Sequence, residues 1–224
     1  MSDPHGGTAS DGDVKTSEAL DVWLDRLAQA DGAPGGGAAC GVMLAVAAAL
    51  LRMVALYTSD DERATQSAAR LVASRREALR AAEADGMRSA ALGAAVGAAP
   101  DSPGRDRSVR DAAVAAAASS ATLGQVGADL LPELELLARI GNPNVTADLV
   151  VAAHALIAGV AGALVNLRGD VELAARHANA GEEDAEWDEL TTAARAMEEV
   201  REAASAIAGT LSAKFDPPDA ATGD

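Results

Sequence analysis

Two long runs of small apolar residues constrain the fold of this chain more than any other feature. The run from Ala38 to Tyr57 is apolar on nearly every side of a helix, and the run from Leu149 to Leu167 is rich in Ala and Gly. Alanine is the best helix former, and a helix that is apolar all round has to be buried. Aromatic residues, which strands favour, make up only 2% of the chain. The sequence therefore predicts an all-α helical bundle with a buried Ala/Gly-rich central helix pair.

Glycine, proline and asparagine breaks divide the chain into the helices of one domain. We expect disordered polar tails at 1–16 and 216–224, and a single helical domain over 17–215. The expected helices are 17–30, 38–57, 61–98, 105–128, a shorter helix after Pro132, 145–167 and 182–213. Because small side chains bury little apolar area, a second subunit would add stability, and we expect a homodimer.

Net charge and cysteine content limit the classes of binding partner and the cellular compartment that we expect. The formal charge of −16 disfavours nucleic acid and anionic membrane surfaces. Cys40 is the single cysteine, which fits a reducing, cytoplasmic compartment, and we expect it to pack in the core. The run Leu149–Leu167 is long enough to span a bilayer. Its small residues and its His154, which we expect to be a hydrogen-bonded core histidine, favour a helix buried in the bundle.

The first motif that can carry chemistry is the run Gly35-Gly36-Gly37, which stands directly before an apolar helix. Glycine lets a ligand approach the backbone closely, and the free N–H groups at a helix start bind an anion or a polar ring. The alternative is a flexible connector. The run alone does not decide between a binding site and a connector.

Two further motifs place polar residues beside apolar helices. Asn142, Asn144 and Asp148 crowd the start of a buried helix, where one such residue is enough to cap it. Asn166 stands near the end of an apolar run after Gly159 and Gly162 and needs hydrogen-bond partners there. Capping explains the first group in part, and the excess of polar residues indicates a second role.

Taken in order, these motifs resemble one enzyme family. The patterns are PGGG opening an apolar helix, then GN-x-N-x-x-(S/T/A)-D, then G-x-x-GA-x-x-N, and the resemblance runs from about Leu24 to Leu173. The order and spacing resemble the cyclodeaminase domain of formiminotransferase-cyclodeaminase and the stand-alone methenyltetrahydrofolate cyclohydrolases. The resemblance implies an all-helical dimer that hydrolyses 5,10-methenyltetrahydrofolate to 10-formyltetrahydrofolate, or closes 5-formiminotetrahydrofolate with loss of ammonia. It implies a tetrahydrofolate derivative as substrate, with no covalently bound cofactor. One cysteine and scattered histidines form no metal-ligand cluster, so we expect no metal.

The resemblance also implies the residues of the site. Asp85 and Asp148 take the catalytic positions, because carboxylates stabilise a cationic intermediate and move protons. If Asp85 is buried, desolvation raises its pKa and suits it to proton transfer; the alternative is a surface position on a charged helix. We expect the glycine run and the Asn142–Asp148 turn to converge on one pocket, within one subunit or at the subunit interface. The implied substrate-binding residues are Gly35, Gly36, Gly37, Asn142, Asn144, Asn166 and Arg168.

Departures from the family pattern leave other functions open. Ala38 stands where Ser is usual, the stretch 58–62 replaces a Gly-Lys stretch, and Asp170 stands where a second Asn is expected. Without that lysine, the candidates for the anionic glutamate tail of folate are arginines such as Arg52, Arg88 or Arg168. One alternative is an enzyme of the same fold that acts on another nitrogenous substrate in specialised metabolism. The other is a non-catalytic dimeric scaffold.

Overall fold

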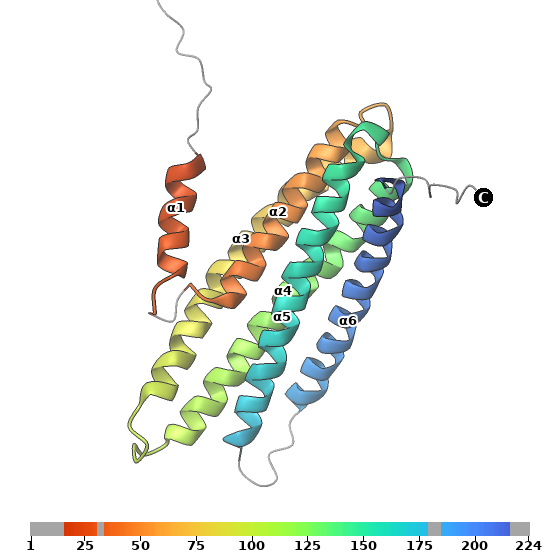
Figure 1. Ribbon diagram of the computed structural model, residues 1–224. Helices are drawn as coiled ribbons and strands as arrows, with labels where there is room; N and C mark the ends of the chain where they lie inside the picture. Colours follow the sequence, from red (N-terminus) through yellow and green to blue (C-terminus); the bar gives the residue numbers. More distant parts are fainter. Residues whose placement is uncertain (1–15, 31–33, 179–184, 216–224) are drawn as a thin grey trace, which may run out of the picture.

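The computed structural model describes residues 16–30, 34–178 and 185–215, and within these residues every regular element is a helix (Figure 1). The all-α prediction is therefore confirmed. The two expected tails lie outside the described residues, except that Thr16 begins the first helix. The elements are α1 (Thr16–Leu27), α2 (Gly36–Leu56), α3 (Glu62–Gly97), α4 (Arg105–Ile140), the 3₁₀ turn η1 (Pro143–Val145), α5 (Thr146–Arg176), α6 (Ala185–Ser212) and the 3₁₀ turn η2 (Ala213–Phe215).

The predicted central pair consists of α2 and α5, which pack against each other and against the long helices beside them. Their small residues allow a close approach. An ideal Cβ on Gly159 of α5 would lie 2.8 Å from Leu44 Cγ of α2, so a larger residue has no room there. Leu44 and Leu51 of α2 and Leu156 of α5 are fully buried at this contact. Glycine and alanine thus set the distance between the helices, and leucines fill the core.

The fourth helix corrects one expectation, because α4 runs without a break through Pro132 to Ile140. A proline removes one helical hydrogen bond and strains the preceding turn. Pro132 itself is exposed, while Leu134 and Leu137 after it are buried in the core. Glu133 adds an ion pair to Arg70 of α3 at 2.6 Å. Packing on both sides of the proline therefore keeps the helix continuous.

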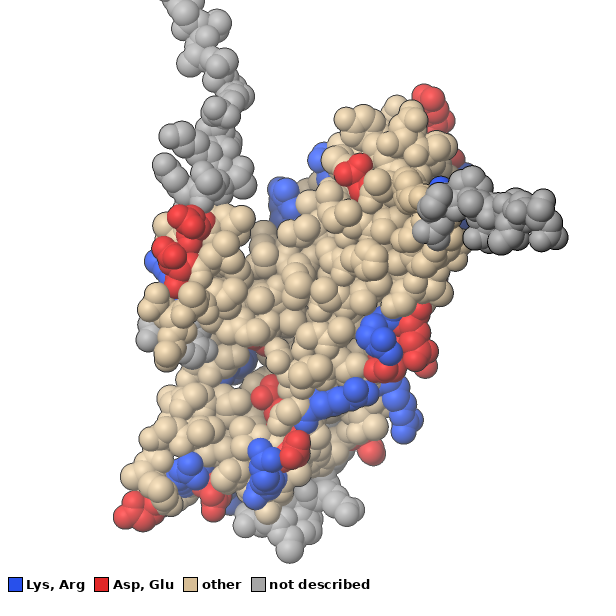
Figure 2. Space-filling model, in the orientation of Figure 1, with Lys and Arg blue, Asp and Glu red and all other residues tan. Residues whose placement is uncertain are grey.

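The outer side of the central pair is apolar and uncovered in the single chain. Val46 of α2 and Val151 and Val165 of α5 are exposed. His154 is also exposed, so the expectation of a core histidine is wrong: the residue lies on the side of α5 that faces away from the core. Figure 2 shows a broad area without Lys, Arg, Asp or Glu over these two helices.

Among the described residues, α2 and the span Pro143–Arg176 are long and apolar enough to cross a membrane. About half of each apolar window is buried inside the bundle, 50% in α2 and 44% in the second span. Core helices of this kind meet the same length and composition limits as membrane helices.

Helix α1 lies apart from the main bundle, beside the point where α2 begins (Figure 1). Its apolar stripe includes Leu20 and Leu24, and each of these residues is 46% exposed. The stripe is therefore only partly covered by the rest of this chain.

Candidate active site

The glycine run forms the start of α2. Gly35 is the N-cap residue and supplies no side-chain cap, and Gly36 and Gly37 are the first two helical residues. The first N–H groups of a helix have no partner within it. An ideal Cβ on Gly37 would lie 2.2 Å from Oδ2 of Asp85, which is on α3. Glycine at position 37 is thus what allows the Asp85 carboxyl group to lie against the start of α2.

Asp85 is buried, with 3% of its surface exposed, although it lies on a helix whose outer face is charged. The Ser89 hydroxyl donates to Asp85 Oδ2 at 3.3 Å, and Ser119 of α4 is a second hydrogen-bond partner. Burial raises the pKa of Asp85, and these two hydroxyls offset part of that rise. The burial on which a proton-transfer role depends is therefore present, and the surface alternative for Asp85 is wrong.

A second acid, Asp170 of α5, lies within the electrostatic range of Asp85. Burial, followed by the charge of Asp85, raises the pKa of Asp170 to about 6. The sequence marked Asp170 only as a departure from the family pattern. Its position one helical turn after Asn166 was the signal that the two share a face.

Cys40, one turn into α2, borders the same cluster. Burial, and then the charge of Asp85, raises the pKa of the Cys40 thiol to about 11. An ideal Cβ on Gly162 of α5 would lie 2.5 Å from the sulfur. The thiol is therefore protonated near neutral pH and packs against α5, as expected from the sequence.

Asn166 completes the cluster from α5. An ideal Cβ on Gly36 would lie 3.7 Å from Asn166 Nδ2, so the amide faces the start of α2. Three helices thus bring together the glycine run, Asp85, Asn166 and Asp170. Figure 2 shows a recess near the base of α1 with acidic atoms inside it. Two carboxyl groups, an amide and a helix start can together position a polar molecule and transfer its protons.

The Asn142–Asp148 turn lies at the other end of α2. Asn142 Nδ2 donates to the Tyr57 carbonyl at 2.9 Å, and the Asn142 backbone N–H donates to Thr58 Oγ1 at 3.0 Å. The 21 residues of α2 separate the two ends by roughly 30 Å at the usual helical rise. The expected convergence on one pocket is therefore wrong within one chain. Convergence at a subunit interface stays a prediction.

In this second region, Asn142 is the residue that stabilises the turn. Asn142 Oδ1 accepts the backbone N–H of Asn144 at 3.0 Å and caps η1. Asp148 lies in the first turn of α5, as expected, and is half-buried, while Asn144 is exposed. Asn142 therefore has a structural role, because it caps η1 and connects the turn to the end of α2.

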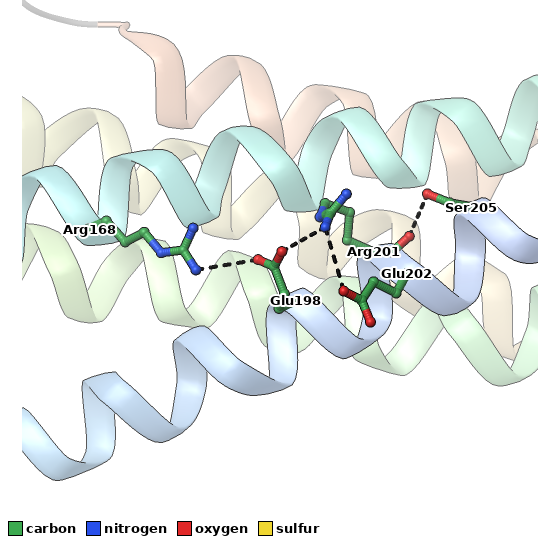
Figure 3. Close-up of polar contacts among 5 residues, drawn as sticks. All are labelled: Arg168, Glu198, Arg201, Glu202 and Ser205. Carbon is green, nitrogen blue, oxygen red and sulfur yellow. Dashed lines mark hydrogen bonds and ion pairs between the residues drawn. The ribbon is translucent and has the colours of Figure 1, made fainter.

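Arg168 faces a different part of the bundle from Asn166. Two residues along a helix turn the side chain by roughly 200°, and Arg168 points to α6. It lies 3.4 Å from Glu198, which also pairs with Arg201 at 2.6 Å (Figure 3). Arg168 lines a groove of about 420 Å³ between α5 and α6. The structure does not bring it to the start of α2.

Other arginines differ in their distance from the cluster. Arg88 lies next to Ser89 in the chain, and with Arg110 it lines a groove of about 410 Å³ between α3 and α4. Arg52 is an exposed residue near the far end of α2. Among the described residues, no group of three or more His, Cys, Asp or Glu could hold a metal ion.

The fold and this cluster together define an all-α bundle with two neighbouring acids, an amide and a glycine-opened helix start at one end of its central helix. Residues 19–175 match the family model for formiminotransferase-cyclodeaminase, and the chain belongs to that family. It is also similar in fold to the solved formiminotetrahydrofolate cyclodeaminase from Thermotoga maritima, with a TM-score of 0.73 and 21% sequence identity. The match covers 88% of this chain and 96% of that one. No curated protein matches the chain significantly.

Proposed function

We propose that this chain is a folate one-carbon enzyme that acts on the group carried between N5 and N10 of tetrahydrofolate. The reaction is either hydrolysis of 5,10-methenyltetrahydrofolate or ring closure of 5-formiminotetrahydrofolate with release of ammonia. Membership of the formiminotransferase-cyclodeaminase family supports the substrate class. The observation that carries the proposal is the position of the buried Asp85 carboxyl group. It lies against the start of α2 because Gly37 has no side chain.

The chemistry of both reactions suits this cluster. Each passes through a cationic carbon between two nitrogens and needs a proton acceptor and a proton donor. A buried carboxylate stabilises that positive charge and accepts a proton. The Asn166 amide, beside Gly36, can hydrogen-bond to the edge of a pterin ring. Asp85 is therefore the proposed catalytic residue, and Gly36, Gly37 and Asn166 form the proposed binding surface.

The anionic glutamate tail of folate needs a cationic partner. Arg88 and Arg110 line the groove between α3 and α4, and Arg88 adjoins Ser89, the hydrogen-bond partner of Asp85. We assign the tail to this groove. Arg168 and Arg52 lie on other parts of the bundle.

The test is to incubate the purified protein separately with 5,10-methenyltetrahydrofolate and with 5-formiminotetrahydrofolate and to follow the absorbance of the methenyl bridge. The absorbance falls in hydrolysis and rises in ring closure. Asp85→Asn should lower turnover by roughly a hundred- to ten-thousand-fold. Asp129→Asn, which removes an exposed carboxylate of α4 bonded to Gln125, is the matched control. Absence of turnover with both folates, or normal turnover in Asp85→Asn, contradicts the proposal.

A second candidate is an enzyme of this fold that acts on a non-folate nitrogenous substrate. The observation that favours it is the stretch 58–62, which stands where the family pattern has Gly-Lys. Thr58 accepts the Asn142 backbone N–H, and Asp61 caps α3 through the backbone N–H of Arg63 at 2.8 Å. Thr58 and Asp61 thus have structural roles at helix ends, and the stretch 58–62 supplies no lysine for the glutamate tail of a folate. Turnover of another cyclic amidine, sensitive to Asp85→Asn, with no turnover of either folate would favour this candidate.

We also propose that the chain is a cytoplasmic homodimer. The exposed apolar side of α2 and α5 and the half-exposed stripe of α1 support an interface with a second copy. Light scattering should give twice the mass of the chain at micromolar concentration. Val46→Glu and Val165→Glu, which place charges on this side, should shift the protein to a monomer, and a monomeric wild type contradicts the proposal.

A further inference from the structure

We propose that Asp170 is a second acid–base residue of this site, so that Asp85 and Asp170 together supply the proton donor and the proton acceptor of the reaction. The catalytic part of this inference rests on the proposed function. The electrostatic coupling of the two acids does not rest on it, because that coupling can be measured without a substrate.

The placement of the two acids is the first support. Asp85 comes from α3 and is 3% exposed, and Asp170 comes from α5 and is partly buried. Asp170 follows Asn166 by one turn, and the Asn166 amide faces Gly36 at the start of α2. Both acids therefore lie where a ligand at the start of α2 would also meet the Asn166 amide.

The groups that surround the pair come from every neighbouring helix. Cys40 faces it from α2, Ser89 from α3 and Ser119 from α4. Farther toward the end of the bundle, α4 carries Arg110, which is bonded to Asp111, and Asp106 pairs with His177 at 2.9 Å. Helix α6 meets α5 on the Arg168 side, through Glu198.

The electrostatics favour one proton on the pair below about pH 6. Two carboxyl groups in one partly buried site do not both ionise easily, because burial and mutual repulsion oppose the second negative charge. Burial raises the pKa of Asp85, and burial with the charge of Asp85 raises the pKa of Asp170 to about 6. The two protons then leave in steps that belong to the pair rather than to either residue.

A singly protonated pair fits the ring closure of a protonated formimino group. N10 forms a bond to the formimino carbon, and the carboxylate takes the proton that N10 loses. The carboxylic acid gives its proton to the former imino nitrogen, the bond from that nitrogen to the carbon breaks, and ammonia leaves. The positive charge stays on the new N5–C–N10 bridge, and the pair still holds one proton.

The first measurement needs no substrate. Protein labelled with ¹³C at the aspartate carboxyl carbons is titrated by NMR as wild type, Asp85→Asn and Asp170→Asn. We expect a wild-type step near pH 6 that is absent in Asp170→Asn and moves to lower pH in Asp85→Asn. Glu172→Gln, which removes a surface carboxylate two residues from Asp170 and paired with Arg176, should leave that step in place. A step unmoved by Asp85→Asn overturns the coupling of the two acids.

The second measurement is the pH profile of turnover with the folate that the wild type uses. We expect two limbs in the wild type, and in Asp170→Asn the loss of one limb with a fall in turnover of roughly ten- to a hundred-fold. A purely structural Asp170 would lower turnover without removing a limb, and that result overturns the catalytic role. If neither folate is turned over, the proposed function fails, while the titration still decides whether the two acids are electrostatically coupled.

Discussion

The two ends of α2 carry similar kinds of residues but differ in how those residues are bonded. At the start of α2, Gly36 and Gly37 leave room for Asp85 and Asn166, and the buried Asp85 carboxyl group has only hydroxyl groups as its identified hydrogen-bond partners. At the far end, Asn142 bonds to both Tyr57 and Thr58 and caps η1. Burial of the Asp85 carboxyl group at the first end costs folding free energy. The hydrogen bonds of Asn142 at the far end stabilise the turn there.

This difference separates the proposed chemical site from a structural connection. A buried acid with a raised pKa destabilises the folded protein near neutral pH, so a function is the usual reason to retain it. A turn whose amides bond to neighbouring backbone groups needs no such reason. Polar composition alone does not distinguish the two ends; the bonding of each polar group does.

The largest expected effect that tests this comparison comes from Gly37→Ala. The added Cβ would lie 2.2 Å from Asp85 Oδ2, so the carboxyl group has to move. A displacement of about 1 Å in a catalytic group can cost roughly a hundred-fold in turnover. We expect a loss of this size in the methenyltetrahydrofolate assay.

Gly36→Ala is the matched control for that change. Its Cβ would meet Asn166 Nδ2 at 3.7 Å, an ordinary contact. Because Gly36 belongs to the proposed binding surface, its change should act on KM, while kcat stays within about threefold of wild type since Asp85 is not displaced. Equal losses in the two variants would show that the start of α2 is sensitive to any substitution, and the specific link between Gly37 and Asp85 would be lost.

The next effect is a pH-dependent gain in stability in Asp170→Asn. Because the pKa of Asp170 is raised to about 6 in the folded protein, folding binds protons between about pH 4 and 6, and the contribution of this group to stability falls as pH rises through that range. The variant should match wild type below about pH 4 and exceed it at pH 7 by roughly 1 to 3 kcal/mol. Denaturant unfolding at several pH values measures the difference. Glu172→Gln should show no such dependence, and a constant difference at all pH values contradicts the prediction.

The sequence predicted the helices better than the relation between the two ends of α2. Helical periodicity and alanine content placed the core, and the family resemblance selected Asp85 on a helix that is otherwise charged outside. The break expected at Pro132 was wrong, because leucines on both sides of it pack in the core. A local propensity says nothing about such packing.

The grouping of site residues was harder to predict, because motif order does not give position in space. Asn166 and Arg168 are neighbours in sequence, but the turn of the helix directs one to α2 and the other to α6. The length of α2 already implied that a turn bonded to its far end lies roughly 30 Å from the glycine run. Which end the Asn142 turn would meet depended on contacts that only the fold supplies. Asp170 was visible as one turn after Asn166, but its proximity to Asp85 was not.

A smaller effect should follow from Asn142→Ala at the far end of α2. The variant loses the bond to the Tyr57 carbonyl and the cap on the Asn144 backbone N–H. Loss of such a cap costs about 1 kcal/mol of stability, with turnover within about twofold of wild type. Thermal unfolding and the folate assay measure both. Asn144→Ala is the control, because Asn144 is exposed and only its backbone N–H bonds to Asn142. A large loss of turnover in Asn142→Ala would give this end of α2 a chemical role.

The smallest expected effect is that of Asp148→Asn, and it tests the comparison most directly. Asp148 is half-buried in the first turn of α5, where its charge favours the helix N-terminus. Within one chain it lies at the end of the bundle opposite Asp85. We expect a stability loss of about 0.3 to 1 kcal/mol from the weaker interaction with the helix dipole, and unchanged turnover. A fall of a hundred-fold or more, with the fold retained, would mean that Asp148 reaches the reaction from a second subunit. The catalytic role implied by the family resemblance would then hold across a dimer interface, and the two ends of α2 would belong to one composite site. Mixing Asp85→Asn and Asp148→Asn subunits separates the two cases, since only a composite site regains activity in the mixed dimer.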